Sequence, residues 1–196
     1  ERHSPTWKKM DTAESLMNTK PDSALVILEG IPTSDVKGKE TSARYALLKS
    51  MALDKNCIDT TTFDVLQPAI DYYIEHGSPD EQLRTYYYQG RIYQNQGDND
   101  SAMQSFMRGK EFCQEASDTL AMANLMVAQA TILYSTYKID DYIKNNLDAA
   151  ELYKAINRPD YEISCLANVL DGSILNNDRT LADRVMSIAQ ELSLIH

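Results

Sequence analysis

The feature that most constrains the fold is a series of segments with helical periodicity, separated by short turn sequences. In the segment 81–96, the apolar face of one helix is formed by Leu83, Tyr86, Tyr87, Gly90 and Tyr93. Segments of the same character cover residues 6–19, 22–30, 41–56, 63–75, 99–115, 118–136, 140–156, 160–176 and 180–193. The chain is therefore predicted to be all-α, with about ten helices joined by connections short enough for antiparallel neighbours.

Three turn sequences place a proline and an aspartate where a helix is expected to begin: Lys20-Pro21-Asp22, Ser78-Pro79-Asp80 and Arg158-Pro159-Asp160. Proline fixes a φ angle that suits the first helical turn. The carboxylate accepts free backbone amides and is favoured by the positive end of the helix dipole. In the sequence 97–100, Gly97 predicts a helix end, and the polar side chains after it predict the cap of the next helix.

The helical segments repeat in pairs. In the unit that starts at Leu83, the first helix carries Tyr86, Gly90 and Tyr93, and the second carries Ala102 and Phe106. The small residues Gly90 and Ala102 are expected to let the two helices approach closely, with Tyr93 and Phe106 filling the space beside the contact. Units with apolar residues at corresponding positions start at Ala43, Asn124 and Ile163, so the interval is about forty residues.

This pattern resembles the tetratricopeptide repeat, in its longer-repeat bacterial form, because the standard interval is roughly 34 residues. The resemblance implies a right-handed superhelix, or solenoid, of antiparallel helix pairs. It predicts an N-terminal helical pair with a linker over residues 1–39 and four hairpins in one continuous array over residues 40–196. HEAT and armadillo repeats remain open as alternatives at this spacing.

A second resemblance concerns the first third of the chain. The sequences Pro21-Asp22-Ser23-Ala24-Leu25, Ala43-Arg44-Tyr45-Ala46-Leu47-Leu48 and Asp54-Lys55-Asn56 are similar to the N-terminal part of tetratricopeptide-repeat proteins of gram-negative gut bacteria. Many of these are exported lipoproteins, and some continue into a membrane helix and a regulatory part. The resemblance favours a periplasmic or outer-membrane location over the cytoplasm. Membrane contact is expected only through an N-terminal lipid anchor or a downstream segment, and the natural protein is expected to continue beyond His196.

Composition argues against several other classes of function. The formal net charge of −10 disfavours nucleic-acid binding, which needs a basic face, and seven glycines leave little room for a phosphate-binding loop. The cysteines Cys57, Cys113 and Cys165 are too far apart for a zinc site and are expected to be small buried residues on helices. His76 lacks a nucleophilic partner and is expected at a helix C-terminus. No catalytic residue, metal or cofactor is therefore predicted.

The resemblance also assigns candidate peptide-binding residues, because the first helix of each tetratricopeptide pair lines the concave face. They are Arg44, Leu47, Arg84, Tyr87, Arg91, Gln94 and Asn95. Their arginines would form a local positive strip for the carboxylates of an acidic peptide. The alternative is that Arg84 and Arg91 form ordinary surface ion pairs with Asp80, Glu81 or Glu111. The later units do not complete a clamp for a C-terminal carboxylate.

Two functions follow as expectations. The first is a non-catalytic scaffold that binds a protein or peptide on its concave face. The alternative is a sensory or regulatory segment of a longer signalling or transcription-regulating protein. The twelve tyrosines fit either packing between helices or a tyrosine-lined groove.

Overall fold

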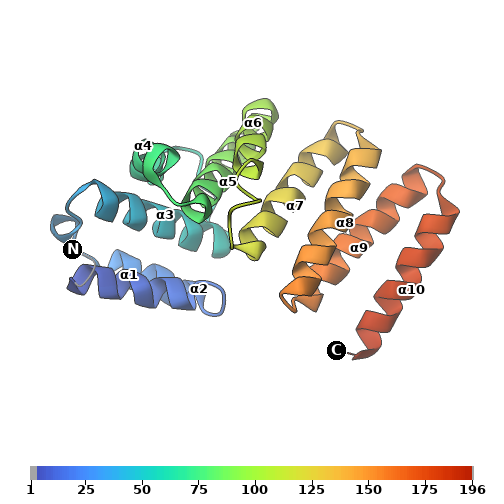
Figure 1. The fold of residues 1–196 in the computed structure, drawn as a ribbon, viewed down its shortest axis with the longest axis horizontal. Coiled ribbons are helices and arrows are strands. Elements are labelled where there is room, and N and C mark those ends of the chain that lie inside the picture. Colours follow the sequence, from blue (N-terminus) through green and yellow to red (C-terminus); the bar gives the residue numbers. More distant parts are fainter. Residues whose placement is uncertain (1–3, 196) are drawn as a thin grey trace. The chain divides into compact units, whose positions relative to one another are not determined.

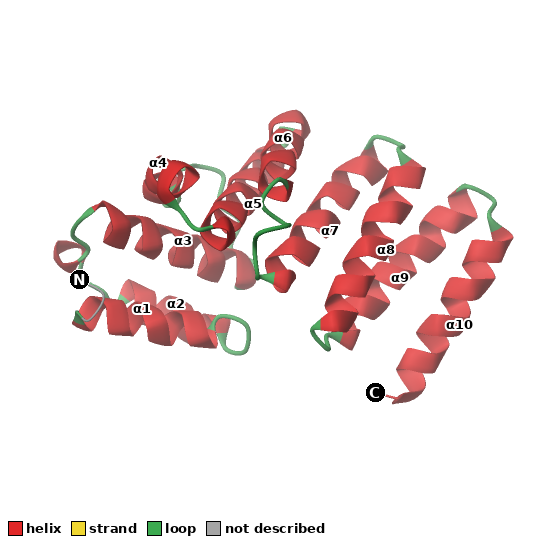
Figure 2. Ribbon diagram, in the orientation of Figure 1, coloured by secondary structure: helices red, strands yellow, loops and turns green. Residues whose placement is uncertain are grey.

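The structure is a computed structural model that describes residues 4–195. Side chains are described up to residue 192. That part of the chain is all-helical, with ten α-helices and no strand (Figures 1 and 2). The helices are α1 (Pro5–Leu16), α2 (Pro21–Glu29), α3 (Lys39–Lys55), α4 (Gln67–His76), α5 (Pro79–Gln96), α6 (Asn99–Lys110), α7 (Thr119–Ser135), α8 (Ile139–Ala155), α9 (Pro159–Leu175) and α10 (Arg179–Ile195). A short 3₁₀ helix, Thr33–Asp35, precedes α3.

The all-α prediction is confirmed, with the clearest differences in α4 and α6. We expected α4 to begin at residue 63, but it begins at Gln67, so that Pro68 lies in its first turn. Proline has no N–H to donate and is tolerated in a first turn but not five residues into a helix. We expected α6 to reach residue 115, but it ends at Lys110. Residues 111–115 continue as tighter turns, in which the amides of Glu111, Phe112, Cys113 and Glu115 bond to the carbonyl three residues back.

The chain forms two compact units, Glu1–Glu115 and Ala116–His196. In the first unit, α1, α3 and α5 contact one another in order, α1 with α3 and α3 with α5. Helix α2 packs against α1 and α3, α4 packs against α3 and α5, and α6 packs against α5. The first helices of successive pairs therefore lie next to each other. The predicted division at residue 39 remains a prediction.

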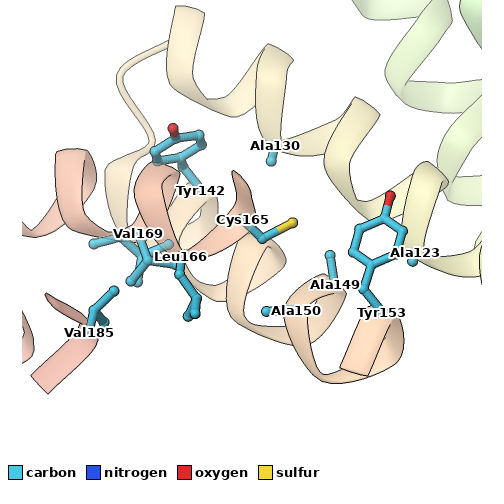
Figure 3. Packing of buried hydrophobic residues seen from close by; sticks show 11 residues of the cluster. Ala123, Ala130, Tyr142, Ala149, Ala150, Tyr153, Cys165, Leu166, Val169 and Val185 are labelled. Carbon is cyan, nitrogen blue, oxygen red and sulfur yellow. The ribbon is translucent and has the colours of Figure 1, made fainter. Parts of the chain in front are cut away.

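In the second unit, α7 packs against α8, α8 against α9, and α9 against α10. Its core is built largely from alanines and medium-sized apolar side chains (Figure 3). Ala123 and Ala130 of α7 and Ala149 and Ala150 of α8 are almost fully buried. Such small side chains let neighbouring helix backbones approach closely, and the larger ring of Tyr153 fills the space at one end.

The repeat interval is visible in the helix bounds. The first helices of four successive pairs, α3, α5, α7 and α9, begin at Lys39, Pro79, Thr119 and Pro159, forty residues apart each time. Helices α7, α8, α9 and α10 each have 17 residues. The pairs that begin with α3, α5 and α7 therefore each take up the same length of chain before the next pair begins.

The turns after α3, α5, α7, α8 and α9 share one geometry. In each, a residue with positive φ follows the helix, and the next amide bonds back to the carbonyl five residues earlier, as in the Schellman motif. The positive-φ residues are Cys57, Gly97, Tyr137, Asn157 and Asn177. The predicted helix end at Gly97 is thereby confirmed, and the carboxylate of Asp98 caps α6 by accepting the amide of Ser101 at 3.0 Å.

The expectation for the cysteines is wrong in two cases of three. Cys165, on α9, is buried as expected, but Cys57 is exposed in the turn after α3, and Cys113 is half-buried in the turns after α6. Position 57 needs a positive φ, so it cannot belong to the preceding helix.

None of the described helices combines the length and the apolar character that crossing a membrane requires.

Candidate functional site

The seven predicted peptide-binding residues all lie in the first unit, on α3 and α5. Three of them, Arg44, Leu47 and Arg84, line a pocket of about 300 Å³. The other lining residues come from α1, α3, α4 and α5, and are Trp7, Glu14, Glu40, Leu48, Tyr73 and Glu81. Packing of α3 against both α1 and α5 therefore brings together side chains that are far apart in the sequence.

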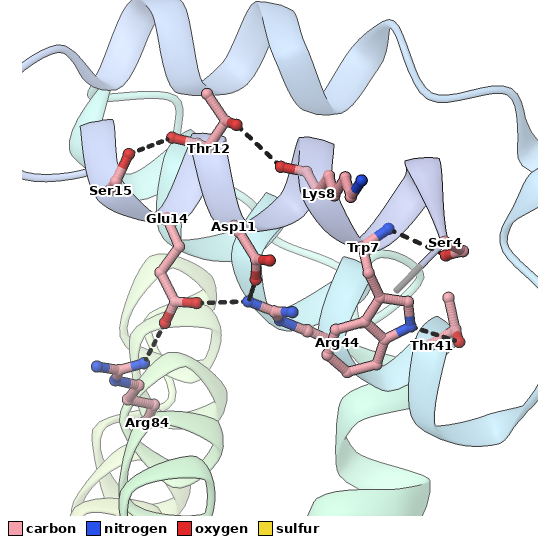
Figure 4. Close-up of polar contacts among 10 residues, drawn as sticks. All are labelled: Ser4, Trp7, Lys8, Asp11, Thr12, Glu14, Ser15, Thr41, Arg44 and Arg84. Atoms are coloured by element: carbon pink, nitrogen blue, oxygen red, sulfur yellow. Dashed lines mark hydrogen bonds and ion pairs between the residues drawn. The ribbon is translucent and has the colours of Figure 1, made fainter. Parts of the chain in front are cut away.

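Arg44 is the most tightly held residue of the site (Figure 4). Its Nη2 donates to Asp11 Oδ1 at 2.7 Å and to Glu14 Oε2 at 2.8 Å, and its guanidinium carbon lies 4.3 Å from the ring centre of Trp7. Partial burial disfavours the charged guanidinium, but the hydrogen bonds to Glu14 and Asp11 outweigh it and raise the pKa of Arg44. The side chain is thus a permanently charged group in a fixed orientation.

Glu14, on α1, connects this helix to both α3 and α5. Besides accepting from Arg44, it accepts from Nη1 of Arg84 at 3.0 Å through its second carboxylate oxygen, Oε1. Trp7, Asp11 and Glu14 lie at positions i, i+4 and i+7 of α1, so they share the helix face that meets α3 (Figure 4). The Trp7 indole is oriented by its own bond, which Nε1 donates to Thr41 Oγ1 at 3.3 Å.

The remaining predicted residues fall into two other places. Arg91 donates to Asp54 Oδ1 at 3.1 Å and to Gln94 Oε1 at 3.0 Å, and Asn95 donates to the carbonyl of Thr60 at 3.0 Å. These contacts tie the last turns of α5 to α3 and to the loop that follows it. Tyr87 is buried, with its ring centre 4.8 Å from that of Tyr88 and 6.1 Å from that of Phe106.

Carboxylates of the protein itself therefore meet all three arginines of the predicted positive strip. Arg44 and Arg84 share Glu14, and Arg91 pairs with Asp54, partners that the sequence did not indicate. Both carboxylates lie on preceding helices, thirty residues or more away from their arginines. Only the packing of α1 on α3, and of α3 on α5, brings them within reach.

Sequence reasoning also missed Trp7 and Tyr73 as members of the site. Tyr73 is almost fully buried, and burial, followed by the negative charge of Glu81, raises the pKa of its hydroxyl. The hydroxyl therefore stays protonated at neutral pH. A sequence signal for this part of the site was available on α1, where one helix face carries Trp7, Asp11 and Glu14. An aromatic ring and two carboxylates on the same face can together contact a cation.

A larger pocket, of about 650 Å³, lies between the beginning of α3 and α4. It is lined by Gly38, Lys39, Ser42, Asp64, Gln67, Pro68, Asp71 and Tyr72. Most of its side chains are polar, and none of the predicted residues belongs to it.

The described residues include no group of histidine, cysteine or carboxylate side chains placed to hold a metal ion. His76 is the last residue of α4, as expected, and lies exposed with its ring centre 5.3 Å from that of Tyr72. His3 and His196 lie outside the described residues.

No protein-family model, no curated protein and no solved structure matches the chain.

Proposed function

We propose that the protein is a non-catalytic scaffold of tetratricopeptide type, whose helix pairs stack in a right-handed superhelix and whose first helices bind a protein or peptide partner. The observation that carries the proposal is the pocket of about 300 Å³ formed by α1, α3, α4 and α5. Tryptophan, tyrosine and arginine, the side chains that dominate interface energies, surround it as Trp7, Tyr73, Arg44 and Arg84.

The site is already ordered without a partner. Arg44 is held by two carboxylates and one indole ring, and Arg84 is held by Glu14. A partner that meets these groups loses little additional side-chain entropy, because their rotamers are fixed before it arrives. Such preorganisation favours a binding surface over a loose cluster of surface charges.

The acidic chemistry proposed for the partner follows from the unequal burial of the two carboxylates on Arg44. The side chain of Asp11 is 59% exposed, whereas that of Glu14 is 36% exposed and bridges both arginines. A carboxylate of the partner can take the place of Asp11 on Arg44 while Glu14 stays where it is. The exchange preserves the number of charge-assisted hydrogen bonds that Arg44 makes.

The test uses a short fluorescein-labelled polyglutamate peptide and measures its binding by fluorescence anisotropy. Asp11→Asn removes the competing carboxylate, so this variant should bind the peptide more tightly than the wild type, by about twofold to fivefold for an exposed charge. Arg44→Gln should abolish binding. Circular dichroism spectra of both variants will show that the helices are retained.

The matched control is Asp100→Asn, which changes the net charge equally at an exposed position of α6. The control should leave the affinity unchanged. The proposal fails if Asp100→Asn strengthens binding as much as Asp11→Asn does, or if a polylysine peptide binds the wild type and depends on Glu14.

A further inference from the structure

Exposed apolar side chains concentrate at one edge of the second unit. Nine large apolar residues are exposed in the described part of the chain, and four of them lie at or beside the α7–α8 and α9–α10 turns. We call these four the turn edge: Tyr134, Tyr137, Ile174 and Leu175, which are 48%, 89%, 61% and 54% exposed. Single exposed apolar residues are ordinary on a protein surface, but a group of them indicates an interaction site.

The two turns are held together by the packing of α8 against α9. Asn176, directly after α9, donates from Nδ2 to Asp140 Oδ1 in the first turn of α8 at 2.7 Å. Tyr142 of α8 contacts the helices on both sides. Its ring centre lies 5.0 Å from that of Tyr134 on α7. The Cδ1 atom of Tyr142 comes within 3.2 Å of the position that a Cβ on Gly172 of α9 would take. Figure 1 shows both turns at the same end of their helices. The four exposed side chains therefore belong to one continuous edge.

Tyr137 is the most exposed of the four and the least suited to its backbone. It has a φ of 57°, in the left-handed region. The corresponding turn positions after α5, α8 and α9 hold Gly97, Asn157 and Asn177, residue types that adopt this region more easily. An aromatic ring here makes the turn less stable than glycine or asparagine would, and it projects into solvent.

The charge around the turn edge is acidic. Asp140, Asp141, Asp171 and Asp178 are exposed there, against the two basic residues Lys138 and Arg179. Within the described residues, none of these four aspartates forms an ion pair, and Asp140 accepts its hydrogen bond from a neutral amide. The surface therefore offers apolar contacts beside carboxylates that, within the described residues, have no cationic partner.

We infer that the turn edge binds a protein segment that carries lysine or arginine next to apolar side chains, such as one face of a basic amphipathic helix. The apolar side chains of the segment cover Tyr137, Ile174 and Leu175, and its cations meet the aspartates. This surface lies in the second unit and does not depend on the pocket proposed above for peptide binding. A membrane of anionic lipids is disfavoured, because the acidic edge repels its headgroups.

The test uses two synthetic amphipathic peptides of equal length, one of leucine and lysine and the other of leucine and glutamate. The leucine–lysine peptide should bind and should shift the amide NMR signals of residues 134–141 and 171–178. Replacing Tyr137 by asparagine keeps the turn and removes the ring, so it should weaken binding by about fivefold or more. Asp140→Asn combined with Asp141→Asn should weaken binding and flatten its salt dependence.

Two control variants make changes of the same kind, apolar to asparagine and aspartate to asparagine, at other exposed places. Met107→Asn replaces an exposed apolar residue of α6, and Asp100→Asn replaces an exposed aspartate of the same helix. Both should bind the peptide as the wild type does. The inference is overturned if the peptide does not bind, if the shifts map elsewhere, if the controls weaken binding equally, or if the leucine–glutamate peptide or phosphatidylglycerol vesicles bind the same residues.

Discussion

The ring of Phe106 on α6 lies directly over Gly90 on α5, with no room for a side chain between them. A Cβ at position 90 would lie 2.3 Å from Cε1 and 2.6 Å from Cδ1 of that ring. Phe106 is fully buried, and so is Ala102 one turn before it. The predicted close approach of these two helices is confirmed, and Phe106 fills the space above the glycine as well as beside it.

Gly90→Ala should therefore destabilise the protein. Alanine improves the intrinsic preference for helix by about 1 kcal/mol, but forcing a methyl group into a packed core costs about 1–3 kcal/mol. The 2.3 Å overlap places this cost at the upper end of its range, so we expect a net loss of about 1–2 kcal/mol in urea unfolding followed by circular dichroism. In a Phe106→Leu background the clash is relieved, and Gly90→Ala should then be neutral or stabilising. Equal stability of Gly90→Ala and the wild type would contradict the packing described.

Tyr137→Gly should stabilise the second unit. The left-handed conformation costs a residue with a Cβ about 1–2 kcal/mol, and glycine avoids most of this cost. After the extra flexibility of glycine in the unfolded chain is subtracted, we expect a gain of about 0.5–1 kcal/mol. Asn157→Gly, at the corresponding turn after α8, should gain less because asparagine tolerates positive φ. A lower melting temperature for Tyr137→Gly would contradict the strain assigned to this turn.

Asn168→Ala should destabilise the contact between α8 and α9. The Nδ2 atom of Asn168 donates to Oδ1 of the fully buried Asn146 at 2.9 Å, and Asn146 in turn donates to the carbonyl of Tyr142 at 2.9 Å. Removing the donor leaves the buried side-chain oxygen Oδ1 of Asn146 without this hydrogen bond, at a cost of about 1–3 kcal/mol in stability. A double-mutant cycle with Asn146→Ala isolates the pair, and a coupling energy near zero would show that the bond contributes nothing.

The three thiols should react in the order of their exposure. Cys57 is exposed and Cys113 half-buried, whereas burial, followed by the charge of Glu162, raises the pKa of Cys165 to about 11. At pH 8, a disulfide reagent should modify Cys57 first and Cys165 only when the native structure opens. Mass spectrometry of the time course identifies each product, and rapid modification of Cys165 would contradict its burial.

The same raised pKa predicts a loss of stability at alkaline pH. The Cys165 thiol ionises near its ordinary pKa of about 9 in the unfolded chain but near 11 in the native protein. Above pH 9 the unfolded state therefore binds fewer protons than the native state, so the free energy of unfolding falls as the pH rises towards 11. Cys165→Ala should show a shallower decrease over this range, and parallel curves for the two proteins would contradict the assignment.

The sequence by itself determined where the helices lie along the chain and where the turns between them fall. Apolar spacing predicted all ten helical segments, and local signals such as Pro79 and Gly97 lie at the ends of helices because they act on their own neighbours in the chain. The predicted start of α4 at residue 63 was wrong because it placed Pro68 inside the helix, although Pro68 is itself a local signal for a helix start. The interval of about forty residues was also readable, because it depends on helix and turn lengths alone.

Only the tertiary structure decided which charges meet. Nothing in the sequence around Arg44 and Arg84 indicates Glu14, which lies on another helix and reaches both only after α1 packs against α3. The same holds for Asn176 and Asp140, which join two turns of the second unit. Helix formation depends on contacts a few residues apart, whereas a side chain's charged partner depends on how helices are placed in space, and that placement is fixed by the packing of the whole core.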